Sequence, residues 1–322
     1  MYRIGVDVGG TNIAIGVVDD SYSIIGKRSI KTSQVPEIGQ MIEAIASGVK
    51  ELISETGISE SDVACVGVGV PGTAELDTGK VMYANNLGFE DEPFLPRLKE
   101  ALGEPLCEKT YFDNDANAAA IGEYVTGGYT EKNFMMVTLG TGIGGGIIID
   151  GKLIRGVNYA AAEFGHMSIN IDDKGCNCGR RGCFETYASA AALVEQAVDS
   201  MEKDVDKKSL LWKNCGKVSD LDGEKFFEAV KEKDELALKV LSQYEIYLAE
   251  GLTNLINILQ PEVLVLSGGI TRAAEYYLDD VRSMVLEKVY SRSSKKNTRI
   301  EVAHGIKDAG DVGIIGAALL GE

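Results

Sequence analysis

The hydrophobic pattern predicts two β-hairpins with glycine turns. In the first twenty residues, two apolar, β-branched runs flank the turn Gly9-Gly10-Thr11. Such runs around a glycine turn are typical of a hairpin. The segment 134–151 repeats this design, and when Thr138 is aligned with Asp7 the glycines of the two turns fall in register. This internal repeat predicts two similar domains, each opening with a hairpin.

Helical and strand patterns alternate along the rest of the chain. Apolar residues recur three or four positions apart over 37–56, and Gly57 is well placed to end that helix. Alternating strands and helices indicate an α/β protein. The remaining pattern predicts strands at 63–70, 263–266 and 299–303, helices at 185–200, 235–259 and 273–289, a closing helix after Asp311, and a polar, irregular insertion or cap at 200–222.

The composition narrows the class of protein. A length of 322 residues, 45% of them hydrophobic, suits about two domains with a normal core. No leader pattern and no apolar run of about 18 residues is present, so we expect a cytoplasmic protein with reduced thiols and no membrane contact. A net charge of −17 without a Lys/Arg cluster predicts no nucleic-acid partner.

The glycine turns can bring backbone N–H groups close to a phosphate. Neither matches a P-loop or a Rossmann fingerprint, because a strand follows each turn. A plain hairpin explains either turn alone, but two turns in register behind Asp7 favour a nucleotide held between two domains. Asp7 would then face Mg²⁺, directly or through water, whereas the alternative is a turn-stabilising Asp. A third turn, Gly268-Gly269, could contact adenosine or simply lead into a helix.

Three polar residues, Asp113, Asn114 and Asp115, separate a strand from a helix. Any of them could cap the helix. Three such residues exceed what one cap needs, and a strand-to-helix junction that faces a cleft is also where a kinase places its general base. The local pattern favours the two interpretations equally.

A histidine and three cysteines have the spacing H-x9-C-x-C-x4-C. This ligand set is typical of a closed, structural zinc site; free buried cysteines are the alternative. Zinc would order the loop that carries Glu163 and Glu185, whose carboxylates could bind vicinal sugar hydroxyls, unless they are simply two surface glutamates. The second ring nitrogen of the histidine could donate to the same sugar. The four expected ligands are His166, Cys176, Cys178 and Cys183.

These motifs together resemble the ROK family of bacterial sugar kinases and sugar-responsive repressors. The resemblance covers essentially the whole chain, and among members of the family the chain is most similar to the glucokinases. It lies, in chain order, in DVGGT, the Pro71-Gly72 pair, ANNLGF, DNDANAAAIGE, LGTGIGGG, EFGH and CNCGRRGCFETYAS.

The resemblance implies a two-domain actin/hexokinase-like (ribonuclease H-like) α/β fold with an interdomain cleft. The small domain would comprise residues 1–115 plus a C-terminal helix at about 308–322, and the large domain, with the zinc site, residues 116–307. Family members are commonly homodimers or homotetramers. The implied activity is ATP- and Mg²⁺-dependent phosphorylation of glucose at O6, a reaction of glycolysis.

Other members of the family have other functions, which leaves two alternatives to the phosphorylation of glucose. One is a kinase of another hexose, such as N-acetylmannosamine, N-acetylglucosamine or fructose. The other is a sugar sensor, either a repressor or a non-catalytic sugar-binding protein. We expect the repressor least, because repressors of the family add a DNA-binding domain before the DVGGT strand, whereas Asp7 lies near the start of this chain. The phosphate turns and Asp115 argue against a non-catalytic protein.

The resemblance also implies individual roles. Asp115 would be the general base, and Asn114 would contact sugar hydroxyls. The implied sugar-binding set is Asn86, Asn114, Asp115, Glu163, His166 and Glu185, with zinc on His166, Cys176, Cys178 and Cys183. The expected nucleotide-binding set is Asp7, Gly9, Gly10, Thr11, Asn12, Thr141, Gly142, Gly144, Gly268 and Gly269.

Overall fold

The computed structural model describes residues 1–84, 87–306 and 311–321. It contains two five-stranded sheets, one three-stranded sheet and helices, which confirms the predicted α/β class. The chain forms two compact units. The first comprises Met1–Lys132, Gly145–Ala162 and His304–Glu322, and the second comprises Asn133–Gly144 and Glu163–Ala303.

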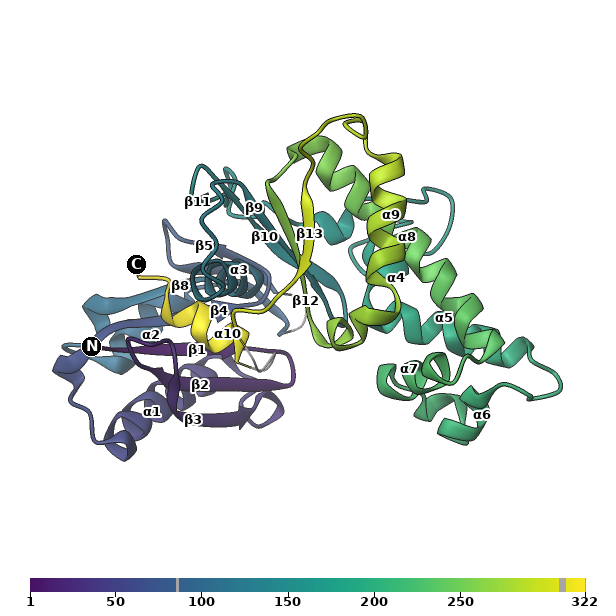
Figure 1. Cartoon of the computed structure of the whole chain (residues 1–322). Coiled ribbons are helices and arrows are strands. Elements are labelled where there is room, and N and C mark those ends of the chain that lie inside the picture. The colour runs from purple at the N-terminus through teal and green to yellow at the C-terminus, as the bar shows by residue number, and fades with distance from the viewer. Residues whose placement is uncertain (85–86, 307–310, 322) are drawn as a thin grey trace. The chain divides into compact units, whose positions relative to one another are not determined.

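The first unit is built on a sheet with the strand order β3-β2-β1-β4-β8 (Figure 1). The predicted hairpin is β1 and β2, which pair antiparallel, whereas β4 and β8 extend the sheet in parallel with β1. A smaller antiparallel sheet, β5-β6-β7, follows β4. The strands are β1 (Tyr2–Val8), β2 (Asn12–Val18), β3 (Ile24–Lys31), β4 (Val63–Val70), β5 (Thr73–Glu75), β6 (Lys80–Ala84), β7 (Phe89–Glu92) and β8 (Thr110–Asn114).

The parallel register aligns three residues at the carboxyl ends of adjacent strands. Asp7 of β1 pairs with Gly69 of β4, and Gly69 pairs with Asp113 of β8. Because carboxyl ends of parallel strands meet at one edge of a sheet, the first glycine turn and the residues after Asp113 emerge at that same edge. The sheet thus brings together two motifs that are about a hundred residues apart in the chain.

Helices cover both faces of this sheet. The apolar face of α1 (Ile38–Thr56) and of α2 (Phe94–Leu102) packs into the main core, and α10 (Val312–Ala318) with α3 (Asp115–Thr126) covers the opposite face. The predicted first helix is confirmed, and it ends at Gly57 in the left-handed conformation, with φ of 70°.

The grouping of α3 with the first unit differs from the predicted boundary after residue 115. Helix α3 lies against α10 so closely that a Cβ on Gly122 would be 2.8 Å from the Cα of Gly316. A Cβ on Gly146 would likewise be 2.5 Å from the Ala120 Cβ, which keeps the segment Gly145–Ala162 beside α3. Such long-range backbone contacts leave no trace in a local hydrophobic pattern.

The second sheet has the order β11-β10-β9-β12-β13, and β12 runs parallel to β9 and β13. The predicted repeat is its β9–β10 hairpin. The strands are β9 (Phe134–Leu139), β10 (Ile143–Ile149), β11 (Lys152–Leu153), β12 (Val263–Ser267) and β13 (Arg299–Val302). The helices of the second unit are α4 (Glu185–Ala188), α5 (Ala190–Lys203), α6 (Leu210–Cys215), α7 (Gly223–Lys231), α8 (Glu235–Leu259) and α9 (Leu278–Lys288).

Several predicted helices have different bounds. The helix predicted at 185–200 is broken at Ser189, whose hydroxyl oxygen accepts a hydrogen bond from Ala192 N and so caps α5. The helix predicted at 273–289 begins as a 3₁₀ helix and continues as α9. The 3₁₀ helices are Thr32–Gln34, Glu60–Asp62, Cys107–Lys109, Phe164–His166, Val218–Asp220 and Gly269–Tyr276.

The segment 200–222 was predicted to be irregular, but it contains the short helix α6. Six residues are too few to show a helical period, although Ser209 caps this helix through a hydrogen bond from Leu211 N. Helix α7 was not predicted either. In the part of the chain that the structure describes, no helix combines the length and the apolar character that crossing a bilayer requires.

Glycines let α10 lie directly on the first sheet. A Cβ on Gly5 of β1 would be 1.8 Å from the Ile314 carbonyl oxygen, and one on Gly67 of β4 would be 1.8 Å from the Ala317 carbonyl oxygen. Real side chains do not approach so closely, so both positions require glycine.

We therefore expect Gly5→Ala to lower the free energy of unfolding by about 1–3 kcal/mol, the usual cost of overpacking. Urea denaturation measures this change. Gly39→Ala is the matched control, because no atom lies within 4 Å of a Cβ at this position in α1. That control should leave stability unchanged or raise it slightly, since alanine favours helices. Equal stability of the two variants would contradict the close contact of α10.

Candidate active site

The first glycine turn joins β1 to β2 and is held by its own backbone. Gly9 N donates to the Asn12 carbonyl oxygen at 2.9 Å, and Thr32 Oγ1 donates to the Gly9 carbonyl oxygen at 2.8 Å. Gly10, Thr11 and Asn12 are exposed at the tip. A fixed turn with exposed backbone amides can bind an anion without rearranging.

Asp7 lies just behind this turn and is largely enclosed. Its carboxylate packs against α10, where a Cβ on Gly313 would be 2.2 Å from Asp7 Oδ2. Burial raises the pKa of Asp7, while the positive charge of Lys27 opposes that shift. A cation bound nearby would favour the ionised carboxylate in the same way as Lys27.

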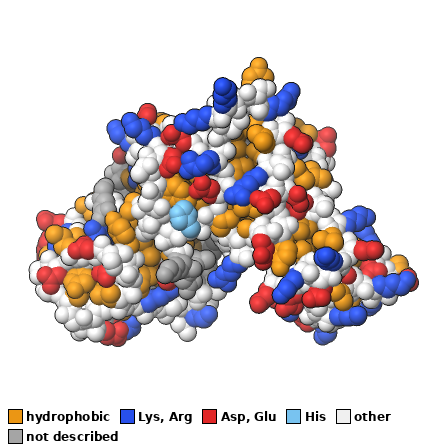
Figure 2. Space-filling view, viewed as in Figure 1, with side chains coloured by type: hydrophobic (Ala, Val, Ile, Leu, Met, Phe, Trp, Pro, Cys, Tyr) orange, Lys and Arg blue, Asp and Glu red, His pale blue; other side chains and the backbone are white. Residues whose placement is uncertain are grey.

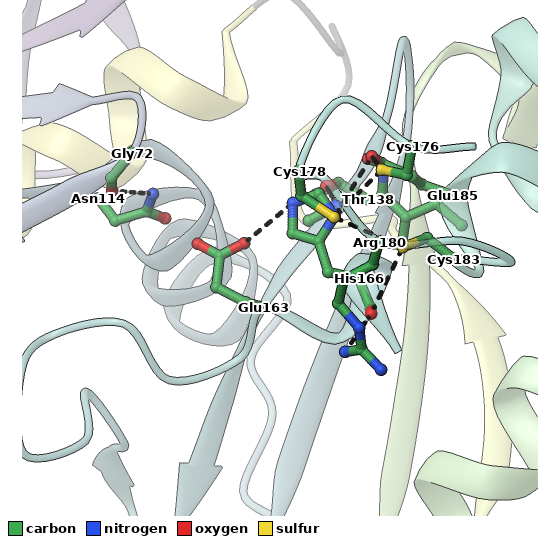
Figure 3. Close-up of polar contacts among 12 residues, drawn as sticks. Gly72, Asn114, Thr138, Glu163, His166, Cys176, Cys178, Arg180, Cys183 and Glu185 are labelled. Carbon is green, nitrogen blue, oxygen red and sulfur yellow. Dashed lines mark hydrogen bonds and ion pairs between the residues drawn. The ribbon is translucent and has the colours of Figure 1, made fainter. Parts of the chain in front are cut away.

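The junction between β8 and α3 shows which of its polar residues is the N-cap of the helix. Asn114 Oδ1 accepts hydrogen bonds from Ala116 N at 2.9 Å and Asn117 N at 3.1 Å, and Asn114 Nδ2 donates to the Gly72 carbonyl oxygen at 2.9 Å (Figure 3). Asn114 is therefore the N-cap. Asp115 is the first residue of α3 and is half-buried, and its Oδ1 also accepts from Ala116 N at 2.9 Å. Asn86, the other predicted sugar ligand of this unit, lies outside the described residues.

The second glycine turn joins β9 to β10. Gly140 N donates to the Gly142 carbonyl oxygen at 3.0 Å, and Gly144 N donates to Thr138 Oγ1 at 3.2 Å. Thr141 is exposed at its tip. A Cβ on Gly142 would be 2.6 Å from Glu185 Oε2, so this turn has no room for a side chain there.

The third turn has a structural explanation for one of its glycines. Gly268 follows β12 with φ of 107°, and a Cβ there would be 2.3 Å from the Leu139 carbonyl oxygen of β9. Packing against β9 thus requires this glycine without any ligand. Gly269 faces open space, with no atom within 4 Å of a Cβ. It is the better placed of the two to approach a nucleotide.

The four predicted metal ligands lie together in the second unit. Their donor atoms are all within 4.8 Å of one another. Cys178 Sγ is 3.6 Å from Cys183 Sγ, and Cys176 Sγ is 3.7 Å from His166 Nδ1 (Figure 3). Ligands about 2.3 Å from a tetrahedral zinc ion would be separated by about 3.8 Å. The donor set and its spacing therefore fit zinc.

Short contacts hold the loop that carries these ligands. Arg180 Nη1 donates to the His166 carbonyl oxygen at 3.0 Å. Gly182 has φ of 70°, and a Cβ there would be 1.7 Å from the Asn170 carbonyl oxygen. Ser168 also pairs with Cys183 as an antiparallel bridge. Contacts of the backbone thus hold this loop in shape, in addition to the grouping of the four donor atoms.

Two glutamates lie on opposite ring nitrogens of His166. Glu163 Oε2 is 3.9 Å from Nε2, and Glu185 Oε1 is 3.4 Å from Nδ1. Glu185 Oε1 also accepts from Cys176 Sγ at 3.1 Å, while its Oε2 accepts from Ile143 N at 3.4 Å. Partial loss of hydration raises the pKa of Glu163; His166 opposes this shift and Glu185 adds to it. Two carboxylates and an imidazole in such proximity can bind several hydroxyl groups of one sugar.

One contact was not anticipated from the sequence. Arg155, in the loop after β11, forms an ion pair with the buried Asp113 through Nε at 2.6 Å from Oδ2. The two residues are 42 positions apart, and Arg155 stands in no motif. Only a covariation signal between such positions could have pointed to it.

Comparison with known proteins shows which protein family the chain belongs to. The ROK family model matches residues 3–322, and the chain belongs to this family. A glucokinase from Halalkalibacterium halodurans is 36% identical over 284 residues, which is 87% of this chain and 84% of the relative. A glucokinase from Thermotoga maritima is 33% identical over 316 residues, which is 98% of this chain and 95% of the relative.

The solved structures agree with the fold. A ROK family glucokinase from Streptomyces griseus, in complex with glucose and AMPPNP, is 32% identical to this chain and superimposes with a TM-score of 0.83. The match covers 99% of this chain and 98% of that chain. The chain thus has the predicted two-domain actin/hexokinase-like fold.

Proposed function

We propose that this chain transfers the γ-phosphoryl group of ATP to O6 of glucose, which gives glucose 6-phosphate and ADP. The observation that carries the proposal is the group formed by Glu163, His166 and Glu185 in a chain of the ROK family. Two carboxylates around one imidazole are suited to a polyhydroxylated substrate. Glucokinases among the relatives support glucose as that substrate.

In this mechanism, Asp115 accepts the proton of the O6 hydroxyl as that oxygen attacks the γ-phosphorus. The bond between the γ-phosphorus and its bridging oxygen then breaks, and ADP leaves. One carboxylate is sufficient for this step. Asn114 would contact sugar hydroxyls from the same junction. The exposed glycine turns would hold the phosphates through backbone amides, and Mg²⁺ near Asp7 would neutralise phosphate charge.

A structural zinc ion would be held by His166, Cys176, Cys178 and Cys183, where its role is to order the loop that carries Glu163 and Glu185. Four protein ligands leave no position for a reactive water, so zinc would have no part in the chemistry.

On the face shown in Figure 2, Lys and Arg side chains lie among Asp and Glu side chains, and the net charge is −17. A small-molecule kinase needs no basic surface. The cytoplasmic location, the homodimer or homotetramer and the sugar contact of Asn86 stay predictions.

The reaction is tested by measuring ADP release with ATP, Mg²⁺ and a panel of sugars: glucose, mannose, fructose, N-acetylglucosamine and N-acetylmannosamine. We expect the highest kcat/KM for glucose. Turnover confined to an N-acetyl sugar or to fructose would keep the mechanism and replace the substrate. A folded, zinc-loaded protein that binds glucose without releasing ADP would contradict the kinase proposal and favour a sugar sensor.

Asp115→Asn should lower kcat by roughly 10²–10⁴, the usual contribution of a general base, because the amide cannot accept the O6 proton. Glucose binding, measured by isothermal titration calorimetry, should change little. Asp199→Asn on the exposed side of α5 is the matched control. If Asp115→Asn retained a near-normal kcat, another residue would have to be the base.

Cys178→Ser should release zinc and weaken glucose binding together, since the metal orders the loop of both glutamates. We expect zinc affinity to fall at least roughly 10- to 100-fold, as it does even for outer partners of metal sites. Metal analysis and calorimetry measure the two effects. Cys107→Ser is the control, because Cys107 lies outside the cluster and bonds to Glu104. Unchanged sugar affinity after zinc loss would refute the ordering role.

A further inference from the structure

Asp113 is a buried carboxylate two residues before the proposed base. Its side chain is 2% exposed. Oδ1 accepts hydrogen bonds from Asn114 N at 2.7 Å and from Asn117 Nδ2 at 3.0 Å, while Oδ2 accepts from Arg155 Nε at 2.6 Å. The Asp113 carboxylate therefore accepts hydrogen bonds from Asn114, just before Asp115, and from Asn117, two residues after it. All of these residues belong to the first unit.

These bonds fix the backbone that presents Asp115. Asn114 is held through its N–H by Asp113 and caps α3 with its side chain. Asn117 is 2% exposed, and its Oδ1 is buried without a hydrogen-bond partner among the described residues, so the bond from Nδ2 to Asp113 is what orients this amide. A Cβ on Gly69 would be only 3.3 Å from the Asp115 Cα, so β4 lies close against the start of α3.

The charge of Asp113 needs compensation in this place. A buried carboxylate is strongly unfavourable unless it is paired and fully hydrogen-bonded. Arg155 supplies the opposite charge from a side chain that is 32% exposed, so its guanidinium remains partly hydrated while it bonds to the buried oxygen. Loss of that partner would leave the buried carboxylate with its charge unpaired, held only by the two donors on Oδ1.

Arg155 is itself held by its loop, the segment Arg155–Ala162. Gly156 has φ of 79°, which redirects the chain directly after Arg155. Further along, the Tyr159 hydroxyl bonds to Asp77, and that hydrogen bond raises the pKa of Tyr159. The loop is thus held to the rest of the first unit at Asp113 and at Asp77, and Arg155 lies near enough to Tyr159 to act on its pKa. The bond to Asp77 offers a matched control, because it holds the same loop without touching Asp113.

We propose that Arg155 is a positioning residue for phosphoryl transfer: it fixes the Asp113 side chain through an ion pair, and Asp113 in turn holds the strand-to-helix turn that presents Asp115. The inference rests on the proposed role of Asp115 as base. Proton transfer requires the base within hydrogen-bond reach of the reacting hydroxyl, and a shift of about 1 Å can cost roughly 10²-fold in rate. The effect of Arg155 should therefore fall on kcat.

The test compares Arg155→Met, Arg155→Lys and Tyr159→Phe with the unaltered chain. We expect Arg155→Met to lower kcat roughly 10- to 100-fold, with the KM for ATP and the calorimetric Kd for glucose within about threefold. Arg155→Lys should regain much of this loss, because a single Nε contact can be replaced by an ammonium group. Tyr159→Phe should keep kcat within about twofold, since the Tyr159 hydroxyl bonds to Asp77 and not to Asp113.

Each other result would overturn the inference. A kcat of Arg155→Met equal to that of Tyr159→Phe would show that the ion pair does not position the base. A parallel loss of glucose binding and of melting temperature without rescue by lysine would show a merely structural role. If Arg155→Met does not fold, Arg155→Gln takes its place, and its kcat must lie below those of Arg155→Lys and Tyr159→Phe at an unchanged glucose Kd. Asp115→Asn, assayed alongside, separates this failure from a failure of the proposed function.

Discussion

The register of three parallel strands is the constraint on which the first unit depends. It sets Asp7, Gly69 and Asp113 side by side at the carboxyl edge of the sheet. Helix α10 can reinforce this register only because Gly5 and Gly67 let its backbone lie on the sheet. The exposed glycine turn and the start of α3 both emerge from this edge. The proposed phosphate-binding turn and the proposed base Asp115 are thus held by the same sheet.

In the second unit, a cluster of metal-type donor atoms rather than a strand register brings the functional side chains together. Glu163 and Glu185 are separated by twenty-two positions, and strands do not align them. A knuckle of four donor atoms brings both to the ring of His166, and Glu185 reaches onward to the β9–β10 turn. Positioning by donor atoms suits a loop, since a loop has no ladder of hydrogen bonds to hold it.

Much of this arrangement could be predicted from local patterns. The hairpins, the helices α1 and α8 and the strands β4 and β12 follow from hydrophobic periodicity and from the residues that end each element. The zinc-type cluster followed from ligand spacing. Local signals failed where an element was short, as for α6, or where a single polar residue broke a helix, as Ser189 does.

The sequence by itself thus determined the α/β class, the glycine turns, the metal-type donor set and the carboxylates available for chemistry, because each depends on residues close together in the chain. Only the tertiary structure decided that Asn114 rather than Asp115 caps α3, that Gly268 is required by β9, and that Arg155 is the partner of Asp113. The last two outcomes depend on residues far apart in the chain, and the Asn114 side chain is fixed in addition by its bond to the distant Gly72. Such contacts form only when packing brings distant segments together, and no local pattern encodes them.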